Sequence, residues 1–196
     1  MAWTTKKEFN FRNTLAYVTD GANAIFVNDA FGAYPQTKTI GGESVDCGWE
    51  IARFSGNSRD RSTTPDVRIA GLVFSPSGIG NNPTFRVDLP SAGNFIIDLA
   101  AGDPVNSNVT KIEIRDTSTV LISIPETSTA AELVDATGVK RTSPSDWVAN
   151  HVTSQQNFAT MIFRIAMMEP SASNTCLSHF SIEQAPGGIG PMFMGV

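Results

Sequence analysis

The residues that could carry out chemistry are few in this chain. Its only histidines are His151 and His179, and neither stands at a metal-binding spacing from a cysteine or a carboxylate. The sequence has no G-x-S-x-G elbow and no phosphate-binding loop, and the glycine-rich run 187–190 leads to no helix. A Ser–His–acid site assembled from distant segments is the alternative that we weigh lowest. We therefore expect a protein that is not an enzyme and that carries no cofactor and no metal.

A dense group of charged residues, Arg59, Asp60, Arg61 and Asp66, has two interpretations. We favour a loop that ion pairs and hydrogen bonds hold to the neighbouring turns. In the other interpretation Arg59 and Arg61 face a partner protein, because arginine is enriched at interfaces. These two arginines are therefore candidate interface residues.

Three carboxylates stand near expected turns and have the chemistry of calcium ligands: Asp98, Asp103 and Asp116. Aspartate is also common in turns because its side chain binds nearby backbone groups. We favour the turn interpretation and expect no calcium site.

Each of the three tryptophans could either stack on a sugar or pack in the core. Sandwich domains that bind sugars use exposed aromatic rings as stacking platforms, and sandwich cores bury tryptophan just as often. We expect Trp49 and Trp147 in the core. Trp3 stays open between the two, because chain termini are often exposed, and it is the candidate stacking residue.

The bulk composition predicts one β-domain. The chain has 196 residues, of which 41% are hydrophobic and only 17% charged, with a net charge of −5. We expect no nucleic-acid binding, because affinity for phosphates depends on clustered basic residues. No stretch approaches the roughly 20 apolar residues that span a bilayer, and residues 1–7 show no secretion signal. We therefore expect folding in a cytoplasm and no membrane partner.

The two cysteines, Cys47 and Cys176, lie far apart in the sequence. A disulfide between them is one interpretation. We favour two buried, reduced thiols, because free cysteine behaves as a small apolar residue and a cytoplasm supplies no oxidising step.

Short alternating segments indicate an all-β fold of the antiparallel jelly-roll or β-sandwich type, with at most one or two short helices. We expect strands over 66–74, 85–89, 95–99, 110–115, 120–124, 160–167 and 177–183, with the second and third joined as a hairpin. A face formed by Met161, Phe163, Ile165 and Met167 belongs to the sixth. One helix is expected at 143–147, capped by Ser143.

The strands predict a single β-sandwich domain over 1–183, of which residues 1–60 show a less regular pattern. An arm rich in glycine, proline and methionine follows over 184–196. Its Met192, Phe193 and Met194 are costly to leave in water. The arm either folds back on its own domain or docks on a neighbouring subunit, so these three residues are also candidate interface residues.

The middle of the chain resembles a group of structural proteins from the virions of tailed phages and prophages, which have a jelly roll like that of carbohydrate-binding modules. The resemblance covers roughly residues 49–183 and rests on RDRSTT at 59–64, DVRIAG at 66–71, TFRVDLP at 84–90, AG at 92–93, LAAGD at 99–103 and VDATG at 134–138. It implies no catalytic residues. It also implies a virion location, with assembly in the host cytoplasm and release by lysis.

Three functions follow in order of preference. The first is a capsid decoration (cement) protein, whose partners are the major capsid protein or other virion proteins, with a homo-oligomer as a further arrangement. The second is a carbohydrate-binding domain of a phage tail or head fibre that contacts glycans of the host surface. The third, a sandwich-fold esterase or glycosidase, is weak because titratable groups are few.

Overall fold

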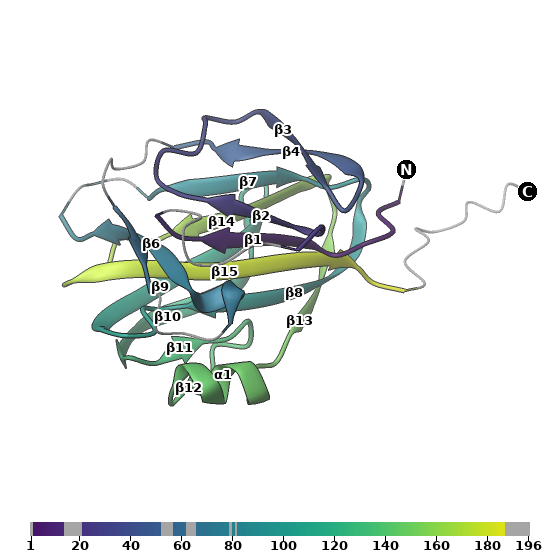
Figure 1. The fold of residues 1–196 in the computed structure, drawn as a ribbon. Coiled ribbons are helices and arrows are strands. Elements are labelled where there is room, and N and C mark those ends of the chain that lie inside the picture. The colour runs from purple at the N-terminus through teal and green to yellow at the C-terminus, as the bar shows by residue number, and fades with distance from the viewer. Residues whose placement is uncertain are drawn as a thin grey trace, which may run out of the picture.

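The structure is a computed structural model that describes residues 2–13, 21–51, 57–61, 66–78, 80 and 82–186. Two packed sheets make up this part of the chain (Figure 1). The larger sheet has the order β12 (Lys140–Arg141), β11 (Leu133–Val134), β8 (Gly93–Ala101), β15 (Asn174–Gln184), β1 (Lys7–Phe11) and β2 (Ala24–Val27), with β13 (Ser154–Phe158) on β8, β6 (Gly71–Pro76) on β15 and β5 (Ser58–Asp60) on β6. The smaller sheet has the order β10 (Thr119–Ala130), β9 (Ser107–Asp116), β14 (Ile162–Met167), β7 (Thr84–Asp88), β4 (Glu43–Trp49) and β3 (Gln36–Ile40).

The long strand β15 runs through the middle of the larger sheet (Figure 1). Along one side it pairs with β8. Its other side is shared, because β6 lies opposite residues 174–177 and β1 opposite residues 179–182. All of these pairings are antiparallel, whereas β1 and β2 pair in parallel. One strand thus brings three separate parts of the chain into register.

Aromatic side chains fill the space between the sheets. The ring of Phe180 on β15 is stacked on that of Phe9 at 4.6 Å and on that of Phe163 at 5.0 Å. Phe163 belongs to the smaller sheet, and Phe85 of the same sheet lies 6.1 Å from Phe180. All four side chains are fully buried. The cluster joins the two sheets, and it forms because each strand directs alternate side chains inward.

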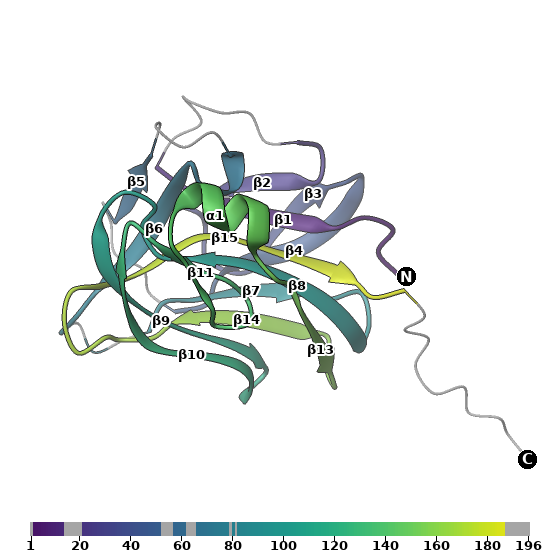
Figure 2. The ribbon, with the colours of Figure 1, turned by 90° about the horizontal axis from the view of Figure 1, so that it is seen from below.

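The helix α1 (Pro144–Asn150) lies on the outer face of the larger sheet (Figure 2). Ser143 accepts a hydrogen bond from the backbone N–H of Asp146, and proline fits the first turn because its missing N–H needs no partner there. The buried indole of Trp147 donates to the carbonyl of Leu99 in β8 at 3.0 Å. The predicted helix is confirmed and extends to Asn150.

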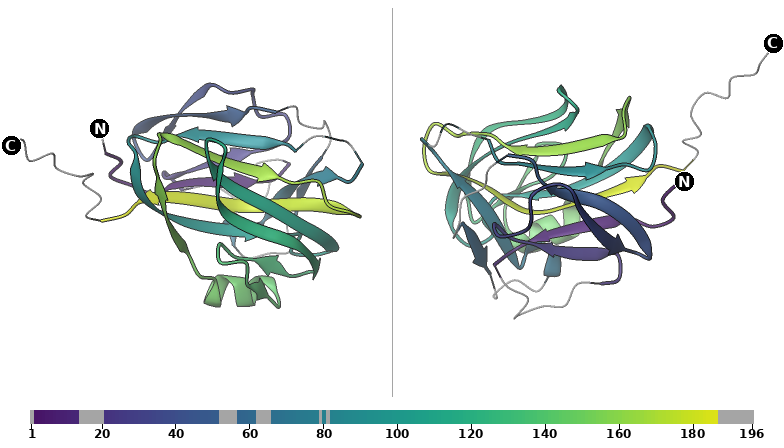
Figure 3. Two further views of the ribbon diagram at one scale, coloured as in Figure 1. Left: turned by 180° about the vertical axis from the view of Figure 1, so that it is seen from behind. Right: turned by 90° about the horizontal axis from the view of Figure 1, so that it is seen from above.

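The all-β antiparallel sandwich with short helices is confirmed. The predicted hairpin of 85–89 with 95–99 is wrong, because β7 and β8 belong to different sheets. Alternation shows that a strand has one buried face, but it does not show which sheet the strand joins. The short segment after β7 carries the chain across the sandwich, as the two views in Figure 3 show.

Two smaller strand predictions also need correction. The expected strand at 66–74 begins only at Gly71, because the side chain of Asp66 accepts from the backbone N–H of Arg68 and starts a 3-10 turn, η1 (Val67–Ile69). Met161 does not share the buried face of Phe163, because it precedes β14 and is 55% exposed. Among the described residues, no helix is long and apolar enough to cross a membrane.

Removal of the central ring should cost much of the stability of the domain. We expect Phe180→Ala to lower the free energy of unfolding by about 3–5 kcal/mol, the usual cost of emptying a packed aromatic site. Met161→Ala, at an exposed position, should change it by less than about 0.5 kcal/mol. Urea unfolding of both variants checks this, and equal effects would show that the aromatic cluster does not hold the sheets together.

Candidate functional site

A pocket of about 470 Å³ lies where the segment before β1 meets the turn between β3 and β4. We call it the Trp3 pocket. Its lining includes an aromatic ring, three carboxylates and two apolar residues from the chain after β7, namely Trp3, Glu43, Asp46, Asp88, Leu89 and Pro90.

The turn below the pocket depends on glycine. Ile40 pairs with Glu43, so that Gly41 and Gly42 form a two-residue hairpin turn, and both have positive φ (61° and 79°). A Cβ atom on Gly41 would lie 2.2 Å from the hydroxyl oxygen of Thr5. Glycine at this position therefore allows the segment before β1 to lie directly against the turn.

Lys7 holds the segment before β1 against the turn between β3 and β4. Its side chain is fully buried, and its ammonium group donates to the hydroxyl of Thr5 and the carbonyl of Ile40, both at 2.8 Å, and forms an ion pair with Glu43. These three acceptors match the three N–H groups of an ammonium. The hydrogen bond from Lys7 holds the pKa of Glu43 below its usual value. The backbone N–H of Thr4 also donates to Glu43, at 2.9 Å.

Trp3 is held in place from three directions. Its backbone N–H donates to the side-chain oxygen of Gln184 at 3.2 Å. Its ring packs edge-on against Phe95 at 6.1 Å, and the ammonium of Lys7 lies 5.6 Å from the ring centroid. The ring is half-buried and still lines the pocket. Trp3 thus packs against the core and also presents part of its ring to the pocket, and its role as a stacking residue stays a prediction.

Two carboxylates of the pocket come from adjacent strands. Asp46 on β4 and Asp88 on β7 each neighbour the inward pair of Cys47 and Val87, so both carboxylates lie on the outer face of the smaller sheet. Asp88 accepts from the hydroxyl of Tyr34 at 2.8 Å and pairs with the guanidinium of Arg86 at 2.7 Å.

The phenol of Tyr34 is affected in turn. Burial, together with the bond to Asp88, raises the pKa of Tyr34, which therefore stays a hydrogen-bond donor at neutral pH. Carboxylate oxygens only accept hydrogen bonds when ionised. The Trp3 pocket thus combines an indole with acceptors for groups such as hydroxyls.

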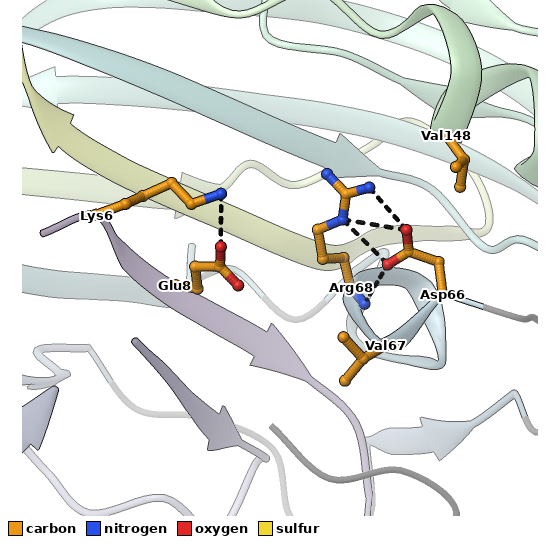
Figure 4. A pocket seen from close by; sticks show the side chains of 6 residues that line it. All are labelled: Lys6, Glu8, Asp66, Val67, Arg68 and Val148. Atoms are coloured by element: carbon orange, nitrogen blue, oxygen red, sulfur yellow. Dashed lines mark hydrogen bonds and ion pairs between the residues drawn. The ribbon is translucent and has the colours of Figure 1, made fainter. Parts of the chain in front are cut away.

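A second pocket, of about 480 Å³, lies between β1, η1 and α1 (Figure 4). Its charged groups bind one another: Lys6 pairs with Glu8 at 2.5 Å, and Arg68 pairs with Asp66 at 2.7 Å. None of the described residues that line this second pocket is aromatic, whereas the Trp3 pocket contains an indole, so the Trp3 pocket is the better candidate site.

Beneath this second pocket lies a buried charge cluster centred on Asp98. One of its carboxylate oxygens is 3.4 Å from Nε2 of His151, 3.5 Å from the guanidinium of Arg68 and 3.7 Å from Nε2 of His179. Burial alone would raise the pKa of Asp98, but the nearby side chains of His179, His151 and Arg68 lower it to about 2. Trp147 covers the cluster, stacked on His151 at 4.3 Å and below Arg68 at 4.8 Å.

Asp98 was expected near a turn, and this placement is wrong because it lies within β8. Residues 68, 98, 151 and 179 are far apart in sequence, so no local spacing signals the cluster. Because Asp98 and His179 are buried, we assign the cluster to the packing of α1 and η1 on the sheet. Asp103 and Asp116 do bind backbone N–H groups near turns, those of Val105 and Ala159. Within the described ranges, no group of three or more His, Cys, Asp or Glu residues could hold a metal ion.

The remaining candidate residues are placed as follows. The guanidinium of Arg61 forms an ion pair with the buried Asp103. Arg59 lies over the ring of Phe74 at 4.8 Å. Met192, Phe193 and Met194 lie outside the described residues.

Trp49 and Trp147 are in the core, as predicted. Cys47 and Cys176 are free and buried, which confirms the prediction of two thiols. Burial raises the pKa of Cys47 to about 12, and it raises the pKa of Cys176 as well.

The lowered pKa of Asp98 makes a pH-dependent contribution to stability. The folded-state value is about 2 against an ordinary 3.8, so the ionised carboxylate stabilises the fold above about pH 4, and this is lost as the pH falls toward 2. We expect the wild type to lose about 2 kcal/mol relative to Asp98→Asn between pH 5 and pH 2. Denaturant unfolding of both proteins across this range measures the difference. A gap that does not change with pH would contradict the ionised cluster.

Comparison with known proteins supports the fold through one solved structure, the first of the three described next. No protein-family model and no curated protein matches the chain. The Bacillus subtilis protein YxiM is similar over 92% of this chain and 40% of its own length, at 15% identity and a TM-score of 0.51. The chain therefore spans less than half of that protein. The family 32 carbohydrate-binding module of NanJ from C. perfringens, solved with galactose, matches 71% of this chain and 93% of its own (12% identity, TM-score 0.32). The K3 adhesin domain of Lys-gingipain from Porphyromonas gingivalis matches 59% and 75% (15% identity, TM-score 0.27).

Proposed function

We propose that this chain is a non-catalytic saccharide-binding domain whose ligand lies in the Trp3 pocket. The observation that carries the proposal is the half-buried indole of Trp3, which lines one pocket together with the carboxylates of Asp46 and Asp88. A sugar ring has matching chemistry, with a face of C–H groups and a rim of hydroxyls. The indole offers apolar area of defined geometry, and charged acceptors form the stronger class of hydrogen bonds with hydroxyl donors.

The pocket is suited to binding because its walls are already ordered. Its volume of about 470 Å³ falls within the roughly 300–1,000 Å³ usual for ligand sites. Trp3 is fixed by Phe95 and Gln184, and the carboxylates by their own hydrogen bonds. Little conformational freedom then has to be lost on binding, which favours affinity.

Glu43 of the pocket is unsuited to act as the acid of a glycosidase. A glycosidase needs a carboxylic acid whose pKa is raised so that it can protonate the leaving group. Lys7 instead lowers the pKa of Glu43. We therefore propose that the domain holds a saccharide without cleaving it.

The biological setting of this proposal comes from the resemblance to phage virion proteins. We propose a fibre-associated domain of a virion that contacts glycans on the host surface. The capsid-decoration function expected from the sequence stays a prediction, since the residues of the arm that it uses lie outside the described ones. Copy number in purified virions separates the two, because a decoration protein is present in hundreds of copies and a fibre domain in a few dozen at most.

Trp3 should be the main contact of the bound sugar. On a printed array of neutral glucans, galactans, mannans and xylans we expect selective binding. For the best-bound oligosaccharide, Trp3→Ala should raise the dissociation constant about tenfold or more, as is usual for a central aromatic contact, and Trp3→Phe should recover part of the loss. Isothermal titration calorimetry measures these changes, and assays for reducing ends should show no cleavage.

The matched control is Phe31→Ala. Phe31, like Trp3, is a half-buried aromatic residue packed against the core, but it does not line the pocket. It should leave the dissociation constant unchanged within about twofold. Equal losses in Phe31→Ala and Trp3→Ala would point to general destabilisation and contradict the proposed site.

A further inference from the structure

The charges in the Trp3 pocket are not balanced. Three carboxylates line it, those of Glu43, Asp46 and Asp88, and none of the described lining residues is basic. Two of the three are neutralised from behind, Glu43 by Lys7 and Asp88 by Arg86.

Asp46 is the exception. Its side chain accepts a hydrogen bond from the hydroxyl of Thr37 across the β3–β4 pair at 2.6 Å, which leaves its charge in place. Within the described part of the chain, no ion pair includes Asp46. Among the described residues that line the pocket, Asp46 is therefore the carboxylate without an ion-pair partner.

We infer that the Trp3 pocket selects saccharides without a carboxylate and rejects uronic acids, and that Asp46 is the residue that determines this specificity. The inference rests on the proposed function of the pocket. A hydroxymethyl group can donate a hydrogen bond to a carboxylate oxygen, whereas the carboxylate that replaces it in a uronic acid can only accept. A uronic acid thus brings a second negative charge and has no hydrogen-bond donor at C6. Specificity of this kind commonly comes from a repulsive element.

The expected size of the preference for neutral saccharides follows from the position of Asp46 at the surface. Charge pairs that water reaches change binding by up to about 1 kcal/mol, which corresponds to about fivefold in the dissociation constant. The repulsion is screened by salt, so the preference should shrink as ionic strength rises from about 0.02 M to 1 M.

The test compares matched oligosaccharides that differ only at C6. Cello-oligosaccharides are set against their C6-oxidised glucuronic forms, and oligogalactosides against oligogalacturonides, first on an array and then by calorimetry. We expect the neutral member of the bound pair to bind about fivefold more tightly. Asp46→Asn should remove this preference by strengthening binding of the acidic member while leaving the neutral one within about twofold. Glu126→Gln removes a charge at an exposed position on β10, away from the pocket lining, and should keep the preference.

The outcomes separate the two proposals. Equal or tighter binding of the acidic member to the wild type overturns the specificity and leaves the saccharide site standing. If Asp46→Asn keeps the preference for the neutral member, the specificity role of Asp46 is likewise overturned and the saccharide site is left standing. Absence of binding to every neutral and acidic probe overturns the saccharide site, and the specificity with it.

Discussion

The stack of Phe9, Phe180 and Phe163 is the contact on which the other features of the molecule depend. Phe180 is in the middle strand of the larger sheet, and Phe163 is in the smaller one, so their contact at 5.0 Å fixes how the sheets face each other. Phe9 anchors β1 to the same stack. With β1 held by its aromatic side chain as well as by its pairing with β15, the residues just before it reach the turn between β3 and β4 at a defined place.

That placement turns an ordinary sandwich edge into a pocket. Lys7 is buried, yet all the donors of its ammonium group have acceptors. This hydrogen bonding makes the buried charge tolerable. Through Glu43, Lys7 joins β1 to the opposite sheet. The half-buried ring of Trp3 is a consequence of this clamp. The clamp also explains why Gly41 is needed, since a side chain there would collide with Thr5.

Local patterns predict local structure well in this chain and contacts between distant segments poorly. The cap at Ser143 and the buried Trp49 and Trp147 follow from residue type and spacing. The placement of β7 and β8 in different sheets does not, because alternation shows a buried face and not a partner strand.

The candidate site shows the same division. Trp3 could be proposed as a stacking residue from its type alone. Its pocket could not be predicted, because the turn at Gly41 and Gly42 and the carboxylates come from segments that meet only in the folded chain. The Asp98 cluster could not be predicted from the sequence for the same reason, because its four members share no regular spacing.

The three tryptophans offer a direct test of where a ligand binds. The indole N–H groups of Trp49 and Trp147 donate to the carbonyls of Asn28 and Leu99 inside the protein, so they serve as internal references. In a nitrogen–proton correlation spectrum titrated with the best-bound neutral oligosaccharide, the saccharide-site account predicts that the indole signal of Trp3 shifts while the other two stay fixed. A saturable titration that leaves Trp3 unmoved, or that shifts the signal of Trp147 instead, would contradict it.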